Sequence, residues 1–185
     1  MNIKNNKRGF TLMELLITFA IFAVVVTGMI NVLVSAVKVQ RQMLADQKMV
    51  EEVSYAFEYM TRAIRMAKKD MEGTCVARYA NYNYTNGVFS FLNSEGNCQQ
   101  FKLNNSAIEA RISANSSTPT GSFFPITSDA VTVTGLSFNN GGSSWASGGT
   151  QSKVTILVEA QSLVGSSSIN FQTTVSQRRL NTSYE

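Results

Sequence analysis

The sequence predicts an α+β protein in which one long N-terminal helix packs against a C-terminal antiparallel β-sheet head. Three observations lead to this fold. Residues 10–37 are almost entirely apolar, residues 38–72 are amphipathic with helical spacing, and residues 73–185 are rich in Asn, Ser, Thr and Gly with short β-branched runs. A helix that is apolar all round and then amphipathic needs an apolar environment for its first half and a covering sheet for its second half.

The apolar run is long enough to cross a bilayer. The 28 residues from 10 to 37 would extend about 42 Å as a helix, whereas the hydrocarbon core of a bilayer is about 30 Å thick. Between Arg8 and Lys38 the only charged side chain is Glu14. Because a carboxylate near the centre of a membrane helix costs roughly 2.5–3.5 kcal/mol, Glu14 is expected to have a role. It either snorkels toward the headgroups or meets a cation on another subunit.

Three ordinary kinds of segment could also contain such an apolar run, and each leaves part of the sequence unexplained. A secretory signal peptide would be cleaved near residues 34–36 (Val-Ser-Ala), but its apolar region is normally about 7–15 residues long. A simple single-span anchor explains the length of the run but neither Glu14 nor the Gly9-Phe10 pair before it. A buried core helix is disfavoured because the run is apolar on every side.

Beyond Val37 the helix is expected to continue to about Lys69 and to stop at Gly73. Apolar residues recur at three- and four-residue steps, at Val39, Met43, Val50, Val53, Phe57, Met60, Ile64 and Ala67. Polar residues occupy the opposite side, at Lys38, Arg41, Gln42, Lys48, Glu52, Glu58, Arg62 and Arg65. Among these polar residues, Lys48 with Glu52 and Glu58 with Arg62 are four positions apart, which is the spacing of ion pairs on a helix. We expect the sheet to cover the apolar face from Val50 to Ile64.

The C-terminal part is expected to form antiparallel strands. Runs of β-branched and aromatic residues at 88–92 and 98–103 flank a polar loop at 93–97, which predicts a hairpin. Further strands are expected at residues 107–113, 130–138, 153–160 and 168–178. Pro119 and Pro125 fall in the connection before the strand at 130–138, where they cost no ladder bonds. Trp145, in the Gly/Ser-rich loop 141–149, is either a binding contact or packs back on its own sheet.

The two cysteines, Cys75 and Cys98, both follow the apolar run, and an exported domain with two cysteines is expected to form one disulfide. Closing a loop of about 24 residues would stabilise the fold by roughly 3 kcal/mol in the chain-entropy model. The alternative, two buried free thiols, stays open because free cysteines are often buried. Two cysteines cannot complete a four-ligand zinc site, and the chain contains no histidine.

The start of the apolar run resembles the N-terminus of type IV prepilins and of type II secretion pseudopilins. The resemblance rests on a short basic leader ending at Gly9 and on the residues that follow it, Phe10, Thr11, Leu12, Met13 and Glu14. It implies that prepilin peptidase cuts between Gly9 and Phe10 and that the new N-terminal nitrogen of Phe10 is methylated. It also implies that Glu14 neutralises the charged N-terminus of a neighbouring subunit during assembly.

The resemblance divides the chain into four segments and implies its partners and location. Residues 1–9 are the leader, 10–37 the transmembrane and assembly half of the helix, 38–72 its amphipathic half, and 73–185 the head. The expected partners are other pilin or pseudopilin subunits, prepilin peptidase, the cytoplasmic membrane and the pilus assembly platform. The precursor would cross the inner membrane once, with leader inside and head outside. It would then enter a cell-surface pilus or a periplasmic pseudopilus.

Later parts of the chain resemble W-type minor pilins and J-type minor pseudopilins of type II secretion. The similar segments are Leu-Ser-Phe at 136–138, Val-Thr-Ile-Leu-Val at 154–158, the final strand at 171–181 and the helical stretch 59–65. That group often closes on Thr-x-Val-x-x-Arg-Asn, whereas here Leu180 intervenes before Asn181. Major pilins commonly have a Pro inside the anchor. Residues 10–37 contain none, which favours a minor component.

The net charge is largely a property of the leader. The whole chain has a formal charge of +4, but Lys4, Lys7 and Arg8 lie in residues 1–9. Without these three, 13 basic side chains face 12 acidic ones, a difference of +1. A basic excess on the cytoplasmic side is a feature of membrane targeting. A nearly neutral mature chain disfavours nucleic acid as a partner.

The sequence offers no motif for catalysis. It has no phosphate-binding glycine loop and no nucleophile elbow, and the lack of histidine excludes Ser–His and Cys–His arrangements. Its scattered carboxylates, Glu51, Glu52, Glu109, Asp129 and Glu159, give no reason to converge. We therefore expect a structural subunit that is not an enzyme and uses no cofactor or metal. The alternative is a pilin-like membrane-anchored adhesin or DNA-binding head, and a membrane-anchored enzyme ranks third.

Overall fold

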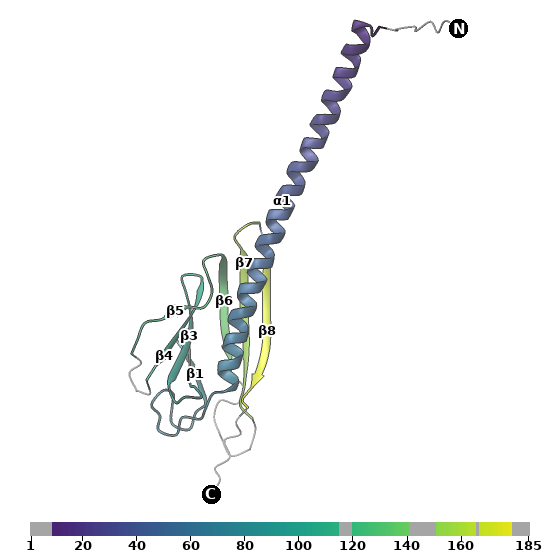
Figure 1. The fold of residues 1–185 in the computed structure, drawn as a ribbon. Coiled ribbons are helices and arrows are strands. Elements are labelled where there is room, and N and C mark those ends of the chain that lie inside the picture. Colours follow the sequence, from purple (N-terminus) through teal and green to yellow (C-terminus); the bar gives the residue numbers. More distant parts are fainter. Residues whose placement is uncertain (1–8, 115–119, 141–150, 166, 179–185) are drawn as a thin grey trace, which may run out of the picture. The chain divides into compact units, whose positions relative to one another are not determined.

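A computed structural model describes residues 9–114, 120–140, 151–165 and 167–178 of the chain. The helix α1 spans Leu12–Arg65 and precedes all of the strands (Figure 1). By its internal contacts the chain divides into two compact units, Met1–Met43 and Leu44–Glu185. The predicted α+β class is confirmed, since one long N-terminal apolar helix is followed by antiparallel sheets.

The strands of the head form two antiparallel sheets. The first sheet has the order β1-β2-β3-β4-β5 and the second the order β6-β7-β8. The strands of the first sheet are β1 Tyr82–Thr85, β2 Val88–Leu92, β3 Cys98–Asn104, β4 Ala107–Ser113 and β5 Phe124–Pro125. Those of the second are β6 Val131–Asn139, β7 Lys153–Ser162 and β8 Ser168–Ser176. Sequential neighbours pair throughout both sheets, which is the usual result of short connections.

Most strands follow the hydrophobic pattern of the sequence. The predicted hairpin is confirmed, with Leu92 paired to Cys98 across the turn. The strand at 107–113 has the predicted bounds, and β6, β7 and β8 agree with prediction within two residues at each end. Two short strands were missed, because β1 contains no aliphatic residue and β5 has only two residues.

Pro125 corrects one prediction about the loops. It lies in β5, opposite Glu109 of β4, and not in an unpaired connection. Because β5 is the outer strand of its sheet, the missing N–H of proline removes no bond to a further strand. Pro119 and the loop 141–149 with Trp145 lie outside the described residues.

The second half of α1 buries most of the predicted face, but the buried stripe is displaced to one side of it. Its buried residues are Met49, Val53, Ala56, Met60 and Ile64. Val53, Met60 and Ile64 are buried as predicted. Val50 is 42% exposed and Phe57 is half-buried, however, and Met49 and Ala56 are buried in their place, which moves the centre of the stripe by about 40°. Phe57 lies at the margin of the stripe, where its ring packs 6.0 Å from that of Phe171 in β8. Val39 and Met43 are exposed, so the covered face begins only at Met49.

The helix ends at Arg65, four residues earlier than predicted, because other elements take over its last backbone groups. Two terminal carbonyls accept from outside the helix, since Tyr82 Oη donates to Ile64 O at 3.1 Å and Arg178 N to Arg65 O at 2.8 Å. Just after the helix, Gln177 Nε2 donates to Ala67 O at 2.7 Å. Lys68 N donates to Leu92 O at 2.8 Å, which forms an isolated bridge to β2. Side chains and strands thus satisfy the carbonyls that a helix end leaves open.

Aromatic rings join the two sheets beneath the helix. The Phe89 ring of β2 stacks on Phe138 of β6 with centroids 4.3 Å apart. Phe89 also packs on Tyr82 and Phe91, and Phe91 on Phe101. All these residues belong to one buried cluster that includes the stripe of α1. The core of the head therefore lies between the helix and both sheets.

Candidate processing and assembly segment

The helix begins at a side-chain cap that fixes the position of Glu14. Thr11 precedes the first helical residue, Leu12. Thr11 Oγ1 accepts the backbone N–H of Glu14 at 3.3 Å, and Thr11 O accepts that of Leu15 at 3.2 Å. Thr11 is thus the N-cap and Glu14 the third helical residue, in the Thr-x-x-Glu pattern of a capping box. The sequence analysis missed this pattern, although its residues lie inside the motif it singled out.

The bond between Gly9 and Phe10 lies outside the helix and is open to solvent. Neither residue is helical, and the Phe10 side chain is 75% exposed. A Cβ added at Gly9 would meet no atom within 4 Å, and Gly9 does not have a positive φ. The local backbone therefore gives no reason for glycine here. Any requirement for glycine would come from a protein that binds this bond.

Glu14 occupies a favourable electrostatic position within its own helix. It is the acidic residue of the first turn, where the unpaired N–H groups of a helix create a partial positive charge. Across the described parts of the chain, no Lys or Arg forms an ion pair with its carboxylate. Hydrolysis between Gly9 and Phe10 would create a new amine four residues before Glu14. That amine and the helix end are the cationic groups nearest to Glu14 in sequence.

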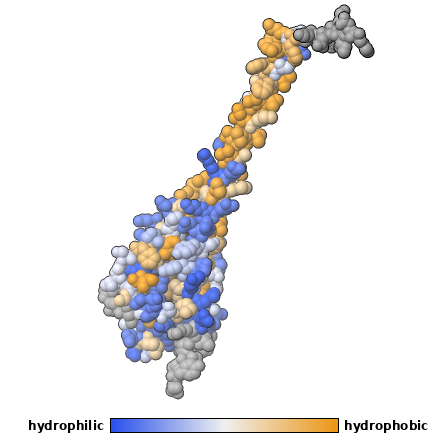
Figure 2. Space-filling view, in the orientation of Figure 1, coloured by the Kyte–Doolittle hydropathy of each residue, from blue (hydrophilic) through white to orange (hydrophobic). Residues whose placement is uncertain are grey.

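The first half of α1 presents apolar side chains on all sides. No residue from Leu12 to Val37 is buried, and Figure 2 shows a largely hydrophobic surface on the visible face of the upper part of the helix. Two hydroxyls in the apolar run are satisfied internally: Thr18 Oγ1 donates to Leu15 O at 2.9 Å and Thr27 Oγ1 to Ala23 O at 2.8 Å. Within the described residues, α1 is the one helix long and apolar enough to cross a membrane.

Gly28 opens a shallow apolar groove on this segment. The groove is lined by Val24, Val25, Gly28, Met29, Val32, Leu33 and Ala36. A Cβ added at Gly28 would meet no atom within 4 Å, so no other described part of the chain packs against this glycine. Small residues let two helices approach closely in a membrane. The groove is therefore a suitable contact surface for another apolar helix.

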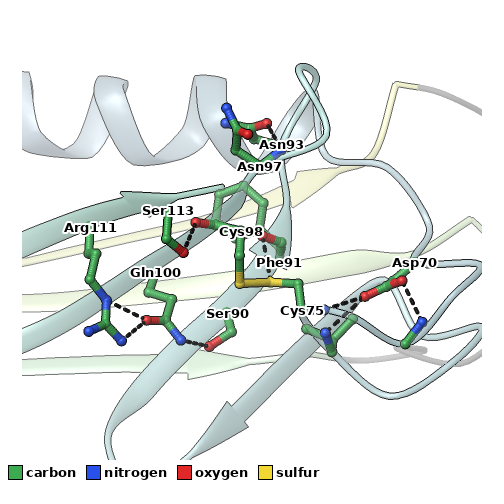
Figure 3. Close-up of a disulfide and its surroundings, with 12 residues drawn as sticks. Asp70, Cys75, Ser90, Phe91, Asn93, Asn97, Cys98, Gln100, Arg111 and Ser113 are labelled. Carbon is green, nitrogen blue, oxygen red and sulfur yellow. Dashed lines mark hydrogen bonds between the residues drawn. A yellow bond between two sulfur atoms is a disulfide. The ribbon is translucent and has the colours of Figure 1, made fainter. Parts of the chain in front are cut away.

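The disulfide predicted from the cysteine count is present. Cys75 and Cys98 are bonded, with Cα atoms 5.3 Å apart, and the described residues contain no free cysteine. Cys98 begins β3, whereas Cys75 lies in the loop that follows α1 (Figure 3). The bond therefore attaches an irregular loop to the first sheet.

A buried carboxylate, which the sequence analysis did not identify, organises the same loop. Asp70 is 1% exposed and receives backbone N–H groups on both oxygens (Figure 3). Oδ1 accepts from Glu72 at 3.1 Å and Gly73 at 2.7 Å, and Oδ2 accepts from Cys75 at 2.7 Å and Val76 at 3.1 Å. Burial by itself would raise the pKa of Asp70, but these donors outweigh it and the pKa is lowered.

The other carboxylates considered from the sequence do not converge. Glu52 accepts the backbone N–H of Ser128 at 3.2 Å, and Glu109 forms an ion pair with Lys102 at 3.2 Å. The predicted helix pair Glu58–Arg62 is present at 2.6 Å, on an exposed face. In the part of the chain that the structure describes, no group of three His, Cys, Asp or Glu residues is arranged to hold a metal ion.

Residues 4–30 match the family described as the prokaryotic N-terminal methylation motif. No curated protein and no solved structure matches the chain. The matched segment contains Gly9, Phe10 and Glu14, together with the beginning of the apolar helix. The N-terminal segment therefore combines this motif with the start of a helix that is long and apolar enough to cross a membrane. The match does not cover the head.

Proposed function

We propose that this chain is a minor pilin or pseudopilin, a structural subunit of a type IV pilus or a type II secretion pseudopilus. The observation that carries the proposal is the position of the motif at residues 4–30. Within this stretch, the exposed Gly9–Phe10 bond lies immediately before a capped helix whose first half is apolar. Prepilin peptidase cuts this bond, and the Phe10 nitrogen is methylated.

The mechanism is a transfer of one helix between two apolar environments. Residues 10–37 hold the precursor in the cytoplasmic membrane, with the basic leader inside and the head outside. The assembly platform then moves the processed subunit into a bundle of sister helices. Both environments bury the same apolar surface, so the transfer leaves little hydrophobic free energy to distinguish them. A polar interaction is needed to direct the transfer.

Glu14 supplies that interaction. The amine of Phe10 and the carboxylate of Glu14 belong to one helix end, and each carries a charge that is unfavourable in hydrocarbon. A new subunit whose amine meets Glu14 of a neighbour removes two unpaired charges in one contact. The capping bond from the Glu14 N–H to Thr11 holds the carboxylate in the first turn while this contact forms.

The assignment to a minor component rests on the head and on the absence of proline from residues 10–37. The alternating strand at 154–158 lies within β7, and the stretch 59–65 lies at the C-terminal end of α1. These segments carry the resemblance to W-type minor pilins and J-type minor pseudopilins. The disulfide Cys75–Cys98 suits a head outside the reducing cytoplasm.

The test is to co-express the chain with prepilin peptidase and to measure its intact mass. We expect loss of residues 1–9 and a methylated Phe10 at the new terminus. Gly9→Ser should leave a precursor, whereas the matched control Gly28→Ser, also in open space, should be processed normally. A mature protein that retains Met1 would contradict the proposal.

Incorporation into filaments tests Glu14 separately. Glu14→Ala should be processed and inserted in the membrane but recovered at a much lower level in sheared or purified filaments. Glu58→Ala, which removes an exposed acid from the head end of the same helix, is the control and should assemble normally. Equal recovery of both variants would exclude the pairing role.

A second candidate, a pilin-like anchored head that binds DNA, is favoured by one observation. The exposed ring of Tyr79 has Arg78 Cζ 4.8 Å and Lys69 Nζ 5.3 Å from its centroid. An aromatic ring beside cations is a common element of single-strand binding. Salt-dependent binding of an oligonucleotide by the full chain, lost in Tyr79→Ala, would support this candidate. No binding at low salt would remove it.

A further inference from the structure

Three of the four sheet edges among the described strands have a feature that prevents a further strand from pairing. β1 has only four residues and β5 only two, one of which is Pro125. β6 has a register shift between Val133 and Gly135, and Val133 N donates to Ser106 O in the β3–β4 turn at 2.9 Å. Short strands, proline, bulges and a covering chain segment are usual ways in which proteins protect an edge. The fourth edge, that of β8, differs from these three.

The edge strand β8 has none of these protecting features. Ser168–Ser176 contains no charged residue, no proline and no glycine, and its nine residues pair with β7 in one continuous register. β8 is the last strand of its sheet, and Figure 1 shows no element beyond it. Within the described part of the chain, residues 168–176 form no backbone hydrogen bonds other than those to β7. The open edge is about 30 Å long.

The register shows which backbone groups of β8 point away from β7. Ser162 N donates to Ser167 O at 2.9 Å, and Gln177 N donates to Ser152 O at 3.1 Å. The odd-numbered residues 167 and 177 thus bond to the β7 side, and the pairing between them is continuous. In an antiparallel ladder every second residue bonds to one neighbour, and the residues between point their N–H and C=O groups the other way. These outward residues are Ser168, Asn170, Gln172, Thr174 and Ser176, and all five are exposed.

The core of the second sheet is incomplete at the same margin. In β7 the inward side chains are at most 1% exposed, at Val154, Ile156, Val158 and Ala160. Opposite them in β8, Ile169, Phe171 and Thr173 are only half-buried, and Val175 alone is buried. Burial therefore falls from the central strand to the edge. A further strand with apolar side chains on this face would cover Ile169 and Phe171.

We propose that the outer edge of β8 accepts an extended segment of another protein chain as a fourth strand of the second sheet. Only an extended peptide presents donors and acceptors at the spacing of a strand edge, which identifies the class of partner. The segment has apolar side chains at alternate positions, because these cover the half-buried face of β8. It carries no charge where it meets β8, which has no charge to pair with it. All of these residues belong to the unit Leu44–Glu185, so strand addition does not depend on a membrane or a filament.

The test measures hydrogen exchange at single amides by NMR, on the full chain in detergent micelles. The probe is a peptide with the sequence of residues 168–176, which is uncharged and alternates apolar and polar residues, flanked by lysines for solubility. Without the peptide, the amides of the outward residues should exchange faster than those that bond to β7. At a peptide concentration of twice its Kd the edge is free about one third of the time, so exchange at the outward residues should slow about threefold.

Two variants at one position separate the backbone of β8 from its side chains. Gln172→Pro removes an outward N–H without removing a bond to β7, and it should abolish the protection by the peptide. Gln172→Ala keeps the N–H and should be protected like the parent. Slow exchange at the amides that bond to β7 reports that the head of each variant is folded. If Gln172→Pro does not fold, a peptide N-methylated at its backbone nitrogens replaces this variant and should give the parent chain no protection.

Three results would each overturn the proposal. The first is unchanged exchange at the outward residues when the peptide is added. The second is equal protection in Gln172→Pro, or by the N-methylated peptide, which would place the peptide elsewhere on the head. The third is slow exchange at the outward residues before any peptide is added. In that case the chain itself or a second copy already covers the edge, and light scattering in detergent distinguishes the two.

Discussion

The two halves of α1 have the same secondary structure but opposite surroundings. From Leu12 to Lys48 no side chain is buried, whereas from Met49 onward a stripe reaches 0–1% exposure. The second half is covered by its own sheets. The first half has no cover within its own unit, although it is the more apolar of the two. One half of the helix thus contributes to the core of the head, and the other half exposes an apolar surface.

The two halves differ in burial and not in helix propensity, so substitutions in them should have different effects. A substitution in the second half acts on the folding of the head. A substitution in the first half leaves the core of the head unchanged and, under the proposed function, alters contacts with the membrane or with neighbouring helices. Matched substitutions in the two halves should therefore give different types of defect, and the following experiments examine this contrast.

The largest effect is expected at Met60. Met60→Ala removes a fully buried side chain and should lower the free energy of unfolding of the head by about 2–5 kcal/mol. Met29→Ala, at a 66% exposed position of the first half, should leave it unchanged. Denaturant titration in detergent, followed by near-UV circular dichroism, measures both. Equal losses of unfolding free energy in the two variants would show that both halves of the helix contribute to the stability of the head.

Removal of the disulfide should affect only the head. Replacement of both Cys75 and Cys98 by Ser should lower the free energy of unfolding by about 3 kcal/mol, because the unfolded chain regains the freedom of the closed loop. Chemical reduction of the native protein should give a similar loss. Protease resistance of the apolar segment in lipid should not change. If the double variant is as stable as the parent, the loop is held by its other contacts alone.

Asp70 should make the head sensitive to acid. Because the folded state lowers its pKa, its contribution to stability is present above the unfolded pKa of about 3.9 and is lost as pH falls through the folded pKa. Asp70→Asn should cost about 1.5–3 kcal/mol near neutral pH and flatten the dependence on pH in the acid range. The exposed neighbour Glu72→Gln is the control. An unaltered acid profile in Asp70→Asn would exclude Asp70 as its source.

The smallest effect is expected at Thr11. Thr11→Ala removes the cap and should destabilise the first turn by about 1 kcal/mol, without an effect on the head. Faster hydrogen exchange at residues 12–16 in detergent would report this local fraying. Thr11→Ser keeps the hydroxyl and should exchange like the parent. If the Ala and Ser variants exchange at the same rate, the hydroxyl of Thr11 does not stabilise the first turn.

Prediction from sequence succeeded where the signal was local. The apolar run, the amphipathic continuation and the alternating strands each repeat at a fixed spacing over several residues. Prediction was less accurate where a shift of one residue along the helix decides which side chain is buried. The buried stripe includes Met49 and Ala56, which were overlooked because Val50 and Phe57 are larger and lie one position away. Hydrophobicity identifies the side of a helix only within about one residue.

The sequence by itself determined the N-terminal methylation motif, the half of α1 that is apolar enough to cross a membrane, the α+β class and most of the strands, because short-range spacing encodes them. Only the tertiary structure decided the end of the helix at Arg65 and the strand β5. It also decided the burial of Asp70 among backbone donors. These features depend on contacts between residues far apart in the chain, such as Gln177 with Ala67. The spacing of neighbouring residues carries no signal for such contacts.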